Sequence, residues 1–189
     1  MRDDKTLTLG YANLVSIYGN LDMADSALAY TRIALKSGVA RSVVATSLES
    51  LIGVTLRHAQ FMDAPDIWER TLPRAEKIDS ALSTPASKYL LALTIGKILE
   101  EETRIAGEVL SGNNVTAASG LTRKRLNDQQ QSYIKVMNCP KLEQNVLQIG
   151  RVGRLLDAGG ATFDPAGASS IRAATVQMRD VMTMLKPYC

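Results

Sequence analysis

The sequence predicts an all-α protein, with seven or eight helices packed as an irregular bundle around one long central helix. Apolar residues recur at intervals of three, four and seven along most of the chain, and β-branched residues follow the same spacing. Glycine and proline fall mainly between these periodic segments, where helices begin and end. The hydrophobic content of 46% can supply the core of one 189-residue domain, and the aromatic content of 5% makes that core aliphatic.

The central helix is predicted at residues 85–112. Ser83 or Thr84 can cap its first turn, and Pro85 suits that turn because its missing N–H would have no partner there. Gly112 can take the left-handed conformation that ends a helix. The apolar face of this helix carries Leu91, Ile95, Ile98, Ile105 and Val109. At 1.5 Å per residue the helix would be about 40 Å long, so the other helices can pack along it.

Two helices are predicted ahead of it, at residues 7–20 and 23–37, with Asp22 as the cap of the second. Five residues of this pair stand at the spacing of a tetratricopeptide repeat: Tyr11, Leu14, Tyr18, Ala27 and Ala34. The pair therefore resembles one tetratricopeptide hairpin. The pattern does not recur downstream, and such arrays need about three repeats to bury a continuous core. We interpret the pair as an ordinary helical hairpin.

Residues 40–60 and 66–82 are the next two predicted helices. Asp63 is expected to cap the second of them. Pro73 lies inside this second helix and predicts a kink or a break, because proline lacks the N–H that a helix interior uses.

Residues 113–120 are polar and rich in small side chains, and they are predicted to form a linker. The linker separates a helical core, residues 1–112, from a basic helical part, residues 121–189. We expect this basic part to pack on the core, so that the two form one domain.

Three helices are predicted in the basic part, at residues 122–138, at 141–158, and from Ser169 or Ser170 to about Leu185. Residues 159–167 contain three glycines and a proline, which predict a loop.

The charge is unevenly distributed along the chain. Residues 1–118 hold 12 Lys and Arg against 14 Asp and Glu, whereas residues 119–189 hold 10 against 5, and the net charge is +3. Such an asymmetry indicates an acidic or polyanionic partner for the basic part, or simply an arginine-rich solvated surface.

Residues suited to catalysis are scarce. His58 is the only histidine, and one histidine cannot build a metal site alone. The two cysteines lack zinc-site spacing, and no nucleophile-elbow, P-loop or HExxH pattern occurs. We therefore predict a protein that is not an enzyme and holds no metal or cofactor.

A second signal is the sequence Ile149 to Arg154, IGRVGR, with Gly150, Arg151, Gly153 and Arg154. It resembles the GxxG loop of a KH domain, here at residues 150–153. The resemblance implies flanking strands near 133–137 and 160–163, and a loop that clamps a nucleic-acid backbone. The alternative is that the two glycines lie inside a helix, where a neighbouring backbone passes close.

A nucleic-acid interface could also form without a KH fold, from a plain basic face. Such a face would bind phosphates without sequence preference. Its candidate residues are Arg123, Lys124, Arg125, Lys135, Arg151, Arg154, Arg172 and Arg179.

The chain has two cysteines, Cys139 and Cys189, and we predict that they pair. The last helix would then have to run back toward residues 138–140. Closing a loop of this length would stabilise the fold by about 4 kcal/mol in the chain-entropy model. A disulfide would indicate a periplasmic or extracellular protein, and two free thiols a cytoplasmic one.

Together these patterns favour a non-enzymatic structural, assembly or interaction protein that acts through protein–protein contacts, with a partner protein or with further copies of itself. The alternative is a nucleic-acid-binding protein that uses the basic C-terminal half. No run of 18 apolar residues occurs, so no transmembrane segment is expected.

Overall fold

The computed structural model describes residues 4–111 and 128–189, and within these ranges nearly every residue is helical and none is in a strand. The predicted all-α class is therefore confirmed. The first five helices are α1 (Asp4–Asn20), α2 (Ala24–Lys36), α3 (Arg41–Met62), α4 (Pro65–Leu82) and α5 (Pro85–Ser111). The remainder are α6 (Asp128–Tyr133), the π turn η2 (Ile134–Asn138), α7 (Cys139–Leu155), the π turn η3 (Leu156–Gly160), α8 (Ala161–Phe163), α9 (Pro165–Leu185) and the 3₁₀ turn η4 (Lys186–Tyr188).

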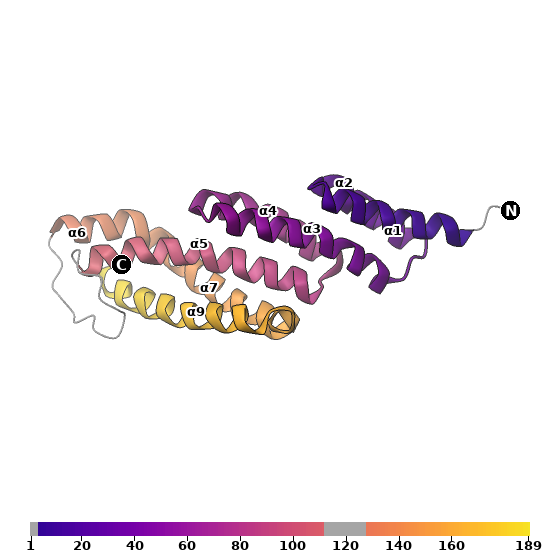
Figure 1. The fold of residues 1–189 in the computed structure, drawn as a ribbon. Coiled ribbons are helices and arrows are strands. Elements are labelled where there is room, and N and C mark those ends of the chain that lie inside the picture. The colour runs from indigo at the N-terminus through magenta and orange to yellow at the C-terminus, as the bar shows by residue number, and fades with distance from the viewer. Residues whose placement is uncertain (1–3, 112–127) are drawn as a thin grey trace.

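Helix α5 is the centre of the arrangement. In Figure 1, α3 and α4 lie above it and α7 and α9 lie below it, while α1 and α2 form one end of the molecule. The C-terminus lies near the other end, beside α6 (Figure 1). The long helix predicted from residues 85–112 is thus the element on which both halves of the chain pack.

The first half of α5 is buried on every side. Its fully or almost fully buried residues include Ala86, Leu90, Leu91, Ala92, Ile95 and Leu99. A helix that is apolar all round is stable only inside a core. Two buried threonines fit there because their hydroxyls donate to carbonyls of the same helix: Thr94 to Leu90 at 2.8 Å and Thr103 to Leu99 at 2.7 Å.

The start of α5 is a capping box. The hydroxyl of Thr84 accepts the backbone N–H of Ser87 at 3.1 Å, and the hydroxyl of Ser87 accepts that of Thr84 at 2.8 Å. Ser83, the other predicted cap, takes a left-handed conformation instead and ends α4. The sequence allowed either Ser83 or Thr84 to cap α5, and in the structure the cap is Thr84.

Two other predicted caps, Asp22 and Asp63, are wrong. Asp22 has a positive φ and its carboxylate lies 2.8 Å from the Arg74 guanidinium of α4. Asp63 also has a positive φ, ends α3, and accepts the indole N–H of Trp68 at 3.2 Å. Aspartate tolerates the left-handed region well, so both residues serve as turn residues.

The cap of the last helix is also different from the predicted Ser169 or Ser170. α9 begins one turn earlier, where the carboxylate of Asp164 accepts the backbone N–H of Gly167 at 2.9 Å. The predicted loop at 159–167 is accordingly mostly helical, with a sharp turn at Gly159, whose φ is 122°.

Helix α4 continues through Pro73 as one element, so the proline does not break it. The segment predicted as one helix at 122–138 begins, within the described residues, at Asp128 and changes from α to π geometry at Ile134. The predicted linker at 113–120 lies outside the described residues.

We expect Gly160→Ala to destabilise the fold by about 1–3 kcal/mol, because η3 packs directly on the backbone of α5. A Cβ at this position would lie 2.9 Å from the Leu155 carbonyl oxygen and 3.2 Å from the Tyr89 nitrogen. Urea unfolding measures the change. The control is Gly153→Ala in α7, where a Cβ meets no atom within 4 Å. That variant should gain about 0.5–1 kcal/mol from helix propensity, and an equal loss in both variants would contradict the packing.

Candidate functional site

The strongest candidate site is a set of large apolar side chains that are exposed on α6, η2 and α7. We call it the outer face and define it as Tyr133, Val136, Met137, Val146 and Leu147. Val136 and Leu147 are each 70% exposed, Met137 53% and Val146 50%. The opposite side of the same segment buries Ile134, Ile149 and Val152 in the core. Grouped exposed apolar residues on a helix mark an interaction surface more often than isolated ones do.

The π turn explains why Val136 and Met137 point outward. Pro140 has no N–H for the carbonyl of Val136, and its ring would crowd that carbonyl in a regular helix. Instead the N–H of Cys139 bonds to the carbonyl of Ile134, five residues back. Residues five apart point about 140° away from each other in an α-helix, whereas a π turn places them nearly one above the other. Ile134 and Cys139 therefore both face inward.

Helix α7 is fixed to α5 through Glu102. The two carboxylate oxygens of Glu102 accept hydrogen bonds from the Lys141 ammonium at 2.8 Å and from the Asn145 amide at 2.6 Å. The hydrogen bond and charge of Glu102 raise the pKa of Lys141 above its ordinary value. Arg151 adds an ion pair of 2.9 Å with Glu76 of α4. These contacts set the rotation of α7, and with it the direction of Val146 and Leu147.

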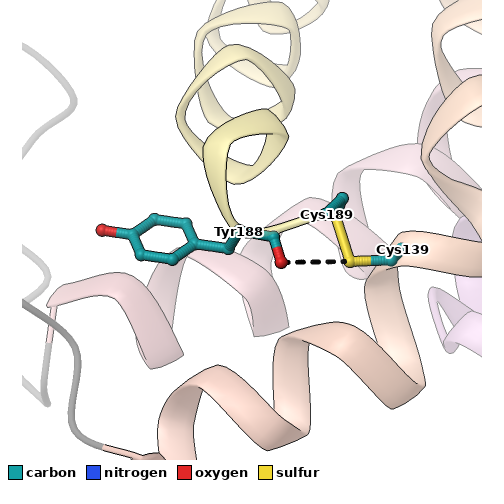
Figure 2. The surroundings of a disulfide bond; sticks show 3 residues. All are labelled: Cys139, Tyr188 and Cys189. Carbon is teal, nitrogen blue, oxygen red and sulfur yellow. Dashed lines mark hydrogen bonds between the residues drawn. A yellow bond between two sulfur atoms is a disulfide. The ribbon is translucent and has the colours of Figure 1, made fainter.

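A disulfide between Cys139 and Cys189 joins the start of α7 to the C-terminus (Figure 2). The two sulfur atoms are 2.11 Å apart and the α-carbons 5.3 Å apart. The Tyr188 carbonyl oxygen lies 4.0 Å from the sulfur of Cys139. The last helix runs back to the junction before Pro140, as pairing of these two residues requires.

Gly150 and Gly153 lie inside α7, so the predicted KH-like loop at 150–153 is wrong. The flanking segments 133–137 and 160–163, expected as strands, are helical. The alternative placed both glycines inside a helix, which is confirmed, but the neighbouring backbone that it expected close to them is not found. A Cβ at Gly153 would meet nothing within 4 Å, and one at Gly150 would meet only the Arg154 guanidinium at 3.4 Å.

The predicted basic face is only partly assembled. Arg123, Lys124 and Arg125 lie outside the described residues. Arg151 pairs with Glu76, and Arg172 pairs with Asp157 at 2.6 Å. Arg154 and Arg179, like Lys135, are exposed. Nucleic-acid binding by this half stays a prediction.

A second polar cluster joins α5 to the start of α9. The Tyr89 hydroxyl donates to Asp164 at 2.8 Å. The backbone N–H of Gly167, and then this hydroxyl, hold the pKa of Asp164 below its ordinary value. Burial, followed by the hydrogen bond and charge of Asp164, raises the pKa of Tyr89. Both groups are thus occupied in joining two helices.

Hollows also lie outside the outer face, and two are formed by described residues. One of about 220 Å³ lies between α5 and α9 over Leu93, Ile171 and Met178. The other, about 580 Å³, lies between α2 and α4, and its charges are paired: Arg74 with Asp22, and Lys77 with Asp25 at 3.4 Å. Neither hollow presents an uncompensated charge to a ligand.

Among residues 4–111 and 128–189, no group of three or more His, Cys, Asp or Glu side chains is placed to hold a metal ion. Within the same ranges, no helix combines the length and apolarity needed to cross a membrane. No protein-family model, curated protein or solved structure matches the chain.

We expect neither cysteine of the unreduced, denatured protein to be alkylated, and both to be alkylated after reduction; mass spectrometry measures this. Reduction should also lower the melting temperature by several degrees, since the cross-link removes up to about 4 kcal/mol of loop entropy from the unfolded chain. The double variant Cys139→Ser/Cys189→Ser is the control, because reductant should leave its melting temperature unchanged. Two alkyl groups on unreduced protein from its native source would refute the pairing.

We expect Asp164→Ala to destabilise the protein by about 1 kcal/mol at neutral pH, through loss of the cap of α9. Because folding lowers the pKa of Asp164, its contribution is fully present above the unfolded pKa of about 4 and is lost as the pH falls through the folded pKa. Urea unfolding at several pH values should show the difference shrinking in acid. Tyr89→Phe, which removes only one donor, should give a smaller effect with the same pH dependence. A pH-independent difference would contradict this assignment.

Proposed function

We propose that the protein is a non-enzymatic assembly subunit that pairs with a second copy of itself through the outer face. The observation that carries this proposal is the arrangement of the face in two apolar groups, Val136 with Met137 and Val146 with Leu147. The groups lie ten residues apart on one helical segment, about 15 Å along its axis.

This arrangement is self-complementary. In a two-fold interface each residue i meets a residue j, and j meets i. An antiparallel pairing centred between Lys141 and Leu142 puts Val136 opposite Leu147 of the second copy, and Met137 opposite Val146. Tyr133 then lies opposite Gly150, where the absence of a side chain leaves room for the ring.

The charges at the ends of the segment fit the same pairing. Asp128 and Arg154 lie at nearly equal distances on either side of the centre, and both are exposed. Antiparallel pairing brings each Arg154 next to Asp128 of the other copy. Within the described part of the chain Arg154 has no ion-pair partner of its own. Such rim pairs add little affinity but orient the two copies.

Glu143 acts against the pairing. It is exposed and lies between the two apolar groups, so two carboxylates come near each other at the two-fold axis. Their repulsion limits the affinity, and added salt screens it. The expected complex is therefore a dimer of modest stability that tightens as ionic strength rises.

The polar clusters support a contact function over catalysis. Glu102 with Lys141 and Asn145, and Tyr89 with Asp164, each join two helices of the fold. The side chains whose ionisation is shifted by these contacts are used for packing, and the outer face is an exposed apolar surface without such a role.

Size-exclusion chromatography with light scattering, over a concentration series, tests the proposal. The wild type should shift from monomer to dimer as concentration rises. Val136→Ser should weaken the dimer at least about tenfold, through loss of a buried apolar contact. The matched control is Val176→Ser, on α9 outside the outer face and 56% exposed, which should change nothing. A wild type that stays monomeric at every concentration would refute self-pairing.

The antiparallel arrangement has its own test. Arg154→Glu and Asp128→Lys should each weaken the dimer, and the double variant should recover it because the charges are exchanged. Glu143→Gln should tighten the dimer by removing the repulsion at the axis. A double variant no stronger than either single one would rule out this register.

A further inference from the structure

We propose that the hollow between α5 and α9 is a binding site for a small neutral aromatic molecule, of one or two rings, that carries an N–H or O–H group. The two helices lie side by side (Figure 1), and the hollow between them has a volume of about 220 Å³. Because the hollow shares no residue with the outer face, binding there is independent of the proposed self-pairing.

The floor of the hollow is apolar and belongs to the core. Leu93, Ile171 and Met178 line it, and each of them is buried. Protein interiors are closely packed, so a molecule that fills the hollow gains dispersion contacts with these side chains. An apolar cavity of about 150 Å³ can hold benzene. The volume of about 220 Å³ therefore suits a ligand of one or two fused rings.

Small residues keep the hollow open. Gly167 and Ala174 of α9 line it, and so does Gly96 of α5. The helices come close at Gly96, where a Cβ would lie 3.5 Å from a methyl carbon of Ile171. At facing positions of this kind larger side chains commonly interdigitate. The hollow is thus the space that short side chains leave between two neighbouring helices.

Both walls of the hollow are held in place by the fold. Helix α5 is fixed in the core by Leu90 and Leu91. The start of α9 is fixed by its cap Asp164, which also accepts the Tyr89 hydroxyl, and Leu185 is buried at its other end. A preformed site of this kind loses little conformational entropy when a ligand binds.

The lining favours an aromatic ligand over an aliphatic one. Met178 and Tyr89 both line the hollow. A thioether sulfur is attracted to an aromatic ring, and two rings attract each other in tilted or offset arrangements. Tyr89 forms such a tilted pair with Phe163, with the ring centroids 5.5 Å apart. An aromatic ligand can make both kinds of contact, whereas an aliphatic one can make neither.

The charges at the rim favour a neutral ligand. Lys97 and Glu100 line the hollow and pair with each other, with the ammonium nitrogen 3.2 Å from a carboxylate oxygen. A charged ligand would compete with this ion pair and would have to move its own charge from water to an apolar floor. A neutral ligand leaves the pair intact.

Ser170 supplies a polar contact at the same rim. It lines the hollow, and its hydroxyl donates to the Ala166 carbonyl oxygen at 3.2 Å. A hydroxyl that donates one hydrogen bond keeps lone pairs that can accept another. The group that matches Ser170 is therefore an N–H or O–H on the ligand, as in an indole or a phenol.

Titration of the whole protein with indole, followed by NMR chemical shifts, tests the site. Indole should saturate one site per chain with a Kd of about 1 mM or lower, which is within reach for a ligand of this size. The largest shifts should fall on Leu93, Ile171 and Met178. A titration that does not saturate within the solubility of indole, or largest shifts elsewhere, would overturn the proposal.

Two leucine variants locate the binding. Ala174→Leu should weaken indole binding at least about tenfold, because the longer side chain occupies the hollow. The matched control is Ala173→Leu, one residue earlier on α9 and exposed, which should leave the Kd unchanged. Urea unfolding checks that both variants fold. Equal affinity of indole for the wild type and Ala174→Leu would refute the site.

Ser170→Ala tests the polar contact without filling the hollow. It should weaken indole binding about three- to tenfold, the effect of one lost hydrogen bond. Binding of N-methylindole, which has no N–H, should be the same in the variant and the wild type. Equal weakening of both ligands would rule out the assigned hydrogen bond.

Discussion

The structure depends on the burial of the first half of α5 on all sides. Leu90, Leu91 and Ala92 are consecutive and buried, which is possible only when several helices enclose the segment. α4 covers one side, and α7, η3 and α9 cover the others. Gly160 lets the backbone of η3 approach the backbone of α5 directly. Because both halves of the chain pack on this one segment, neither half has a complete core without it.

The position of the disulfide follows from this packing. Asp164 caps α9 and accepts the Tyr89 hydroxyl, so α9 starts beside the first turns of α5. The 21 residues of α9 then extend about 30 Å along α5. The end of α9 therefore lies near the start of α7, and Cys189 can bond to Cys139 there. The Asp164 cap and its hydrogen bond with Tyr89 fix the start of α9, and the length of α9 then places Cys189 beside Cys139.

The outer face combines two regions that are packed differently in the fold. Val146 and Leu147 stand on a helix with a buried side and two ion pairs to other helices. Val136 and Met137 stand on η2, in which Ile134 is the buried residue. The two parts of the outer face are therefore held in the fold by different contacts.

The sequence by itself determined the helical class, most helix boundaries and the long central helix, because spacing and the Thr84–Pro85 start are local properties. It also pointed to Cys139 and Cys189, the only cysteines. It could not show that Gly150 lies in a helix, because a glycine pair suits a loop equally well. Nor could it show that Val136 faces solvent. The direction of a side chain depends on whether a turn is α or π, and here the π turn follows from Pro140, the burial of Ile134 and the reach of the distant C-terminus, which only the tertiary structure brings together.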